Sequence, residues 1–180
     1  MSTLLYYLRK LIPRPLFALV RPLYHYLMTT LGAVWYRFPS RHITVIGVTG
    51  TKGKSTVTEL INALFEADGR RTAVAGTIRF KVGEATEPNL HKMTMPGRFF
   101  MQRFLRRAVD AGCSVVILEM TSEGAKQYRH KWIDLDALVF TNITPEHIES
   151  HGSFEKYIAA KFELAKSLER SKKRPRRAVA

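Results

Sequence analysis

The sequence predicts an α/β fold: a P-loop-containing parallel sheet with helices on both faces, preceded by a basic helical N-terminal arm. Two observations predict this class. Apolar runs rich in β-branched residues alternate with segments of helical periodicity, an order that is typical of parallel sheets. A glycine-rich stretch directly follows the first of these runs, where such folds bind phosphates. We therefore expect an arm over residues 1–41 and a phosphate-binding domain over residues 42–180.

The arm is basic and rich in aromatic residues. Residues 1–41 contain six Lys/Arg and no Asp or Glu. Its longest uncharged run, Pro22–Tyr36, is shorter than the roughly 20 residues that a membrane span needs, and Arg14 and Arg21 interrupt any apolar centre of a secretory signal. Two interpretations remain. We favour a helical arm that covers the core; the alternative is a basic amphipathic segment in peripheral contact with an anionic membrane.

The elements of the domain follow the arm in alternation. The hydrophobic patterns predict strands at 43–48, 72–75, 114–118 and 137–141, and helices at 56–67, 97–111 and 153–168. The segment 78–96 is expected to be irregular, with a turn at KVGEATEPN. Pro96 is expected in the first turn of the helix that follows, a position that proline tolerates well.

The net charge of +14 is concentrated at the two ends of the chain. Residues 1–58 hold eight Lys/Arg and no acid, residues 166–180 hold seven Lys/Arg and one Glu, and residues 59–165 balance fourteen against fourteen. No basic stripe is interleaved with aromatic residues, so nucleic-acid binding is not predicted. A single cysteine, Cys113, excludes an intrachain disulfide and fits a reducing compartment, so a cytoplasmic location is expected.

The stretch GVTGTKGKST, residues 47–56, is the first candidate site. Gly47, Gly50 and Gly53 would let backbone N–H groups approach an anion, Lys54 would reach terminal phosphates, and Ser55 would offer a hydroxyl to Mg²⁺. The P-loop pattern G-x-x-x-x-G-K-[ST] requires a glycine where this chain has Val48. The elements on either side of the stretch must therefore show whether it is a phosphate site. A strand before the loop and a helix after it favour a phosphate site over a flexible turn with incidental lysines.

Polar residues at the ends of two later strands are the next candidates. Ligands bind beyond the carboxyl ends of the strands in open parallel sheets. Glu119 ends one predicted strand, Asn142 follows another, and His147 comes shortly after. We expect all three on the same edge as the phosphate loop.

Lys161 lies on the apolar stripe of the last helix, which Ser153 can cap. That stripe runs through Phe154, Tyr157, Ile158, Lys161, Ala165 and Leu168. Burying an ammonium group is costly unless it is paired, and a buried lysine with a lowered pKa is a reactive amine. The alternative is a lysine whose head reaches solvent at the rim of the helix.

Together these motifs resemble the Mur ligase family. The resemblance is carried by GVTGTKGKST, TMP at 94–96, LEMTSEGAKQYRH at 118–130 and FTNITPEHIESHGSFEKYIAAK at 140–161, in the family's order, over about residues 42–178. The family loop reads G-x-x-G-T-x-G-K-[ST], which accounts for the missing P-loop glycine. The resemblance implies a central ATP-binding domain that is incomplete at its C-terminus.

The family's residue roles carry over to matching positions as expectations. The catalytic residues would be Lys54, Glu119, His147 and Lys161, with Lys161 reacting with CO₂ to become a carbamate. ATP would bind at Gly50, Thr51, Lys52, Gly53, Lys54, Ser55, Thr56 and Asn142. Mg²⁺ would be held by Ser55, Glu119, His147 and the carbamate of Lys161. The muramyl-peptide substrate would contact Thr94, Met95, Thr121, Gln127 and Arg129.

The implied reaction joins an amino acid to a UDP-N-acetylmuramyl-peptide through an acyl phosphate, at the expense of ATP, in peptidoglycan precursor synthesis. Lys52, Met95, Thr121 and Glu146 depart from the family's usual residues, and only Met95 removes a hydrogen-bonding group. The family's UDP-sugar domain and its C-terminal domain have no counterpart here, so we expect no full activity from these residues alone. The alternative function is a noncatalytic nucleotide-binding or interaction module.

Overall fold

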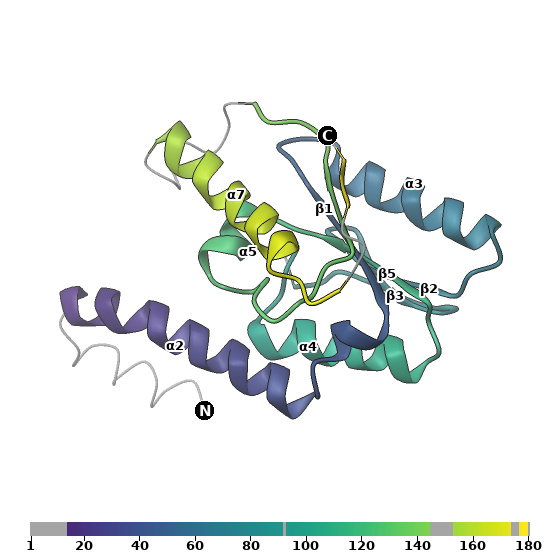
Figure 1. Ribbon diagram of the computed structural model, residues 1–180, viewed down its shortest axis with the longest axis horizontal. Coiled ribbons are helices and arrows are strands. Elements are labelled where there is room, and N and C mark those ends of the chain that lie inside the picture. The colour runs from purple at the N-terminus through teal and green to yellow at the C-terminus, as the bar shows by residue number, and fades with distance from the viewer. Residues whose placement is uncertain (1–13, 92, 145–152, 174–176, 180) are drawn as a thin grey trace.

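The computed structural model describes residues 14–91, 93–144, 153–173 and 177–179, and it shows a twisted sheet with helices on both faces (Figure 1). The sheet has the order β4-β3-β2-β5-β1-β6-β7. Its strands are β1 (Thr44–Thr49), β2 (Thr72–Ala75), β3 (Arg79–Val82), β4 (Ala85–Pro88), β5 (Val115–Glu119), β6 (Ala137–Phe140) and β7 (Arg177–Val179). The five strands from β2 to β7 in this order are parallel, so the predicted fold class is confirmed.

Helices cover the two faces of the sheet unequally. Helix α3 (Lys54–Ala67) packs on one face, and α4 (Arg98–Asp110), α5 (Ser122–Lys126) and α7 (Phe154–Glu169) lie on the other. Strand β1 alternates between them: Val45 joins the core beneath α4 and α7, whereas Ile46 and Val48 pack under α3. This alternation follows from the two-residue period of a strand. Because both faces are buried, the parallel strands read as continuous apolar runs.

The predicted strands and helices match the structure within one or two residues, except between residues 78 and 96. That segment was expected to be irregular, and this is wrong for the residues of β3 and β4, which form an antiparallel hairpin beside β2. The turn expected within KVGEATEPN is present at Gly83 and Glu84, between the two strands. The hairpin escaped the pattern analysis because every residue of β4 is exposed and β3 contains the polar residue Lys81. Pro96 precedes α4 instead of lying in its first turn, because Gly97 is the N-cap residue.

Within the described part of the basic arm, helix α2 (Arg14–Trp35) packs against α4 (Figure 1), and the short helix η1 (Pro39–His42) follows it. Thr29 and Ala33 are buried in this contact. The Trp132 indole donates a hydrogen bond of 2.9 Å to Thr30 Oγ1, and the ring of Tyr26 meets Trp132 at 6.2 Å. One face of the arm therefore lies on the domain. A search of the described helices finds none that is long and apolar enough to cross a membrane.

Candidate functional site

The phosphate loop joins the end of β1 to the start of α3. Gly50 has φ of +149°, and a Cβ atom there would lie 2.0 Å from Thr141 Oγ1, so a larger residue cannot take its place. Gly53 is the N-cap residue of α3, and Lys54 begins the helix. The unpaired N–H groups of the first helical turn therefore face the loop, as an anion site requires.

Gly47 has a different role from the one expected. It lies within β1, and a Cβ there would come within 2.7 Å of Met120 Sδ and 2.9 Å of Leu138 Cδ1. The glycine is thus needed for packing between the sheet and the core side chains. The expectation that Gly47 brings an N–H group toward an anion is wrong.

Asn142 fastens the phosphate loop to the end of β6. Its Oδ1 accepts hydrogen bonds from the backbone N–H groups of Thr51 (3.1 Å) and Lys52 (2.9 Å). Its Nδ2 donates to the carbonyl oxygen of Lys52 at 3.1 Å. Lys54 Nζ donates to the carbonyl oxygen of Thr51 at 2.8 Å, so the lysine head lies over the loop. The side chain of Asn142 therefore fixes the loop backbone.

Glu119 lies at the carboxyl end of β5, next to the start of α3. Its side chain is 2% exposed and accepts hydrogen bonds from Ser55 Oγ (3.1 Å) and from the backbone N–H and Oγ1 of Thr77 (2.7 and 2.9 Å). No basic side chain pairs with it among the described residues. Burying a carboxylate that only neutral donors contact costs free energy, which a bound cation would offset. Hydroxyl and carboxylate oxygens are the ligands that Mg²⁺ prefers. The residues present therefore fit a divalent cation.

Thr77 is a site residue that sequence reasoning missed. It follows β2 by two residues and so stands at the same carboxyl edge as Glu119. The rule that selected Glu119 and Asn142 could also have selected Thr77. A threonine after a short strand carries no distinctive motif, so the sequence pattern does not single it out.

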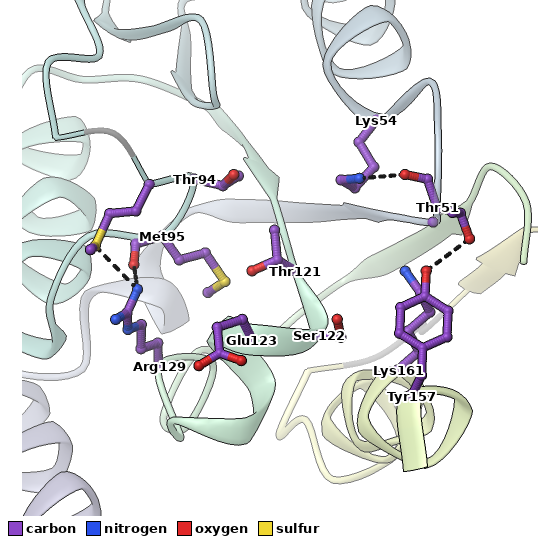
Figure 2. Close-up of a pocket in the computed structure, with 12 residues that line it drawn as sticks. Thr51, Lys54, Thr94, Met95, Thr121, Ser122, Glu123, Arg129, Tyr157 and Lys161 are labelled. Atoms are coloured by element: carbon purple, nitrogen blue, oxygen red, sulfur yellow. Dashed lines mark hydrogen bonds between the residues drawn. The ribbon is translucent and has the colours of Figure 1, made fainter. Parts of the chain in front are cut away.

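Lys161 projects inward from α7, as predicted, and is 2% exposed. Its Nζ lies 4.8 Å from the centroid of the Tyr157 ring. The hydroxyl of Tyr157 forms a hydrogen bond of 2.8 Å with Thr51 Oγ1, so α7 is tied directly to the phosphate loop. Figure 2 shows Tyr157 and Lys161 rising together from α7 toward Thr51.

A cavity of about 360 Å³ brings the phosphate loop, Lys161 and most of the expected substrate residues together (Figure 2). Its expected lining residues are Gly50, Thr51, Lys54, Thr94, Met95, Thr121, Arg129 and Lys161. Sequence reasoning did not assign Met93, Ser122, Glu123 and Tyr157, which also line it. Ser122 and Glu123 directly follow Thr121 inside the motif LEMTSEGAKQYRH, so their place in that motif is the signal that could have found them.

The expected substrate residues hold one another in place. Arg129 donates through Nη1 to the carbonyl oxygen of Met95 and through Nη2 to Gln127 Oε1, the latter at 2.6 Å. Gln127 does not line the cavity itself, but it contacts two residues that do: it accepts from Arg129, and its Nε2 donates to Glu123 Oε1 at 2.6 Å. Thr94 Oγ1 is hydrogen-bonded to Thr77 Oγ1 at 2.8 Å, which links the substrate side to the Glu119 cluster. Thr121 is the N-cap residue of α5, where it accepts from the N–H of Gly124.

The remaining expected ligand, His147, lies outside the described residues, as does Glu146 beside it. Within the described ranges, no three His, Cys, Asp or Glu side chains gather closely enough to hold a metal ion. The structure thus brings Ser55 and Glu119 together, and it leaves the full predicted ligand set of Ser55, Glu119, His147 and Lys161 a prediction.

Known proteins with similar sequences include a ligase and a synthetase named for UDP-N-acetylmuramyl compounds. UDP-N-acetylmuramoyl-L-alanyl-D-glutamate–2,6-diaminopimelate ligase of Chlamydia trachomatis is 40% identical over 142 residues, which are 79% of this chain and 29% of that protein. UDP-N-acetylmuramyl-tripeptide synthetase of Roseiflexus sp. is 38% identical over 143 residues, or 78% of this chain and 28% of that protein. The chain therefore spans less than a third of the length of these curated relatives.

Solved structures and a family profile agree with these relatives. A UDP-N-acetylmuramoyl-L-alanyl-D-glutamate–2,6-diaminopimelate ligase superposes with a TM-score of 0.67 at 25% identity, over 84% of this chain and 35% of its own. Escherichia coli FolC, with a TM-score of 0.58 at 20% identity, shares the fold over 76% of this chain and 38% of its own. Residues 48–176 match the Mur ligase middle domain. This chain belongs to the Mur ligase family.

Proposed function

We propose that this chain is the ATP-binding part of a ligase that adds an amino acid to a UDP-N-acetylmuramyl-peptide. The observation that carries the proposal is the Glu119 cluster. A buried carboxylate without a basic partner among the described residues is hydrogen-bonded to Ser55 at the end of the phosphate loop, and the loop lines the cavity. That combination suits a nucleotide with its divalent cation better than it suits a simple binding surface.

The phosphate loop supplies the charge and the donors that ATP needs. The N–H groups from Gly50 to Thr56 would bind the phosphate oxygens, and Lys54 would leave the carbonyl oxygen of Thr51 to contact the terminal phosphates. Asn142 and Tyr157 hold the loop from two sides, so its donors are already oriented. Such pre-organisation is the main resource of enzymes that transfer phosphoryl groups.

Mg²⁺ would be held by Ser55 and Glu119, with His147 and a carbamate on Lys161 as the other proposed ligands. When bound, the metal would neutralise charge on the phosphates. Lys161 suits a carbamate because its amine is buried beside an aromatic ring and lines the same cavity as the loop. A carbamate replaces a positive charge by a negative one, which favours a divalent cation.

The other end of the cavity is proposed to hold the peptide substrate. Arg129 is fixed by Met95 and Gln127, and it can present a cationic fork to a carboxylate. Thr94 and Thr121 contribute hydroxyl groups on the same side. A peptide carboxylate placed between Arg129 and Lys54 would take the γ-phosphoryl group of ATP and release ADP, which gives an acyl phosphate. The amine of the incoming amino acid would then attack the acyl carbon, and inorganic phosphate and a proton would leave as the amide bond forms.

The alternative, a noncatalytic nucleotide-binding module, is disfavoured by Lys161. A module that only binds nucleotide has no need of a buried lysine on an apolar helix face. We also propose the division into an arm over residues 1–41 and the Mur ligase domain over residues 42–180. A cytoplasmic location fits a chain with one cysteine, Cys113, and these nucleotide-linked substrates.

Calorimetry with Mg-ATP tests the proposal. The wild-type chain should bind Mg-ATP, and Lys54→Ala should weaken this binding at least tenfold. Glu119→Gln should weaken the binding of Mg-ATP more than it weakens the binding of ATP in EDTA. Lys156→Ala is the matched control, because Lys156 is exposed on α7 and away from the cavity lining. If the folded Lys54→Ala chain binds Mg-ATP with wild-type affinity, the loop is not the nucleotide site.

A further inference from the structure

The outer face of α2 carries a row of exposed apolar side chains, which we call the α2 stripe: Leu23, Leu27, Leu31, Val34 and Trp35. These side chains are between 48% and 77% exposed. Their spacing places them on one side of the helix, opposite the buried Thr29 and Ala33. Scattered apolar residues on a surface need no explanation, but a continuous row marks a contact site.

A basic groove lies beside α2. This cavity of about 200 Å³ is lined by Tyr26 of α2, by Trp132, and by the cations Arg41, Lys131, Arg170 and Lys172. Asp134 is the one carboxylate among its described lining residues, and it accepts from Arg41 Nε at 3.0 Å. Four cations against one carboxylate leave a formal charge of +3.

The charges of the basic groove are not balanced locally. Burial, together with the nearby charge of Arg170, lowers the pKa of Lys131. The nearest further carboxylate, Glu163, lies 4.0 Å from Arg170 and is also paired with Lys166 at 2.7 Å. Behind the groove, His130 is 1% exposed, and neither ring nitrogen has a hydrogen-bond partner among the described residues. The groove therefore suits an anion.

We propose that this face of the protein binds the surface of an anionic membrane. The α2 stripe enters the boundary between headgroups and acyl chains, and the basic groove takes a phosphate-bearing headgroup. Charge complementarity favours lipid as the occupant: residues 1–41 hold six Lys/Arg and no acid, and the groove adds a charge of +3. An apolar helix face flanked by cations, with a tryptophan at one end, is the arrangement of interfacial helices.

This inference does not depend on the proposed ligase activity. Helix α2 packs on α4, and residues at the end of α7 line the basic groove, whereas the phosphate loop opens at the carboxyl edge of the sheet. Membrane contact would hold the domain at the bilayer surface with one face of α2 still packed on α4. The arm can thus lie on the core and on lipid at once.

Vesicle co-sedimentation of the full 180-residue chain tests the proposal. We expect binding to phosphatidylcholine vesicles that contain phosphatidylserine, little binding to phosphatidylcholine alone, and loss of binding at high salt. The pairs Leu27→Ser with Leu31→Ser, and Lys131→Ala with Arg170→Ala, should each reduce binding about tenfold. Inorganic phosphate, compared with chloride at the same ionic strength, should reduce vesicle binding only in part, because the α2 stripe still holds the protein on the bilayer. Complete displacement would assign the groove to free phosphate and would overturn the proposal.

The matched control is the pair Leu60→Ser with Leu64→Ser, because these leucines are 59% and 64% exposed on α3, which packs on the opposite face of the sheet. This pair should bind like the wild type. Three further results would overturn the proposal: no binding to anionic vesicles, equal loss in the α3 pair, or self-association that disappears in the Leu27→Ser and Leu31→Ser pair. The last would assign the α2 stripe to a second copy of the chain.

Discussion

Replacing His130 tests the electrostatic account of the region between α5 and α7. Burial, and secondarily the charge of Lys131, lowers the pKa of His130 from 6.5 to about 4. Between these two pH values the unfolded chain binds a proton that the folded chain does not. The free energy of unfolding is therefore not reduced by this residue above about pH 6.5, and it decreases as the pH falls toward about 4. The difference corresponds to about 3 kcal/mol.

Urea unfolding, followed by tryptophan fluorescence over a series of pH values, measures this contribution. His130→Leu removes the titrating group, so the free energy of unfolding of the variant should rise relative to wild type by about 1.4 kcal/mol per pH unit below about pH 6.5. Between about pH 6.5 and about pH 5 the relative gain should reach about 2 kcal/mol.

His42→Leu is the matched control for replacing a histidine by leucine, because His42 is exposed at the end of the short helix η1 (Pro39–His42). The gain in stability at low pH should be larger in His130→Leu than in this control. If the profile of His130→Leu runs parallel to wild type, then burial does not hold His130 neutral, and the account of this region is wrong.

Three further predictions concern the phosphate loop and α7. Gly50→Ala should lower the free energy of unfolding by at least about 2 kcal/mol, because its Cβ would meet Thr141 Oγ1 at 2.0 Å; wild-type stability in chemical denaturation would contradict the loop geometry. With ¹³C-labelled bicarbonate, NMR should show a carbamate signal that Lys161→Ala abolishes, and a wild-type chain without this signal would make Lys161 a structural residue. Tyr157→Phe should cost about 1 kcal/mol of stability through the lost hydrogen bond to Thr51; it should also weaken ATP binding several-fold in calorimetry, and unchanged affinity would show that α7 does not hold the loop.

The sequence by itself determined the class of fold and much of the nucleotide side of the site. Apolar runs and helical stripes are local patterns, so strands such as β2 and the inward position of Lys161 could be predicted from neighbours in the chain. The phosphate loop was predictable because its glycines, lysine and serine are consecutive and stand between a strand and a helix. Glu119 could be predicted as a site residue because it ends a strand, and the carboxyl ends of parallel strands lie at one edge of the sheet, where ligands bind.

Other features depend on which segments contact one another in the folded chain, and the sequence of a single segment does not show its partner. The exposed residues of β4 carry no alternating pattern, so only pairing with β3 defines them as a strand. Gly47 looked like part of the anion site until Met120 and Leu138 were found against it. Thr77 became a partner of Glu119 only through the adjacency of β2 and β5.

The arm and His130 show the same limit most clearly. The pattern of the arm allowed packing on the core or contact with lipid, and the structure places one face of α2 on α4 while it leaves the α2 stripe exposed. His130 follows a polar motif, yet it is buried because α5 and α7 pack against each other. Hydrophobic periodicity fixes which side of a helix turns inward, but the partner that covers each side is decided by contacts between residues far apart in the chain.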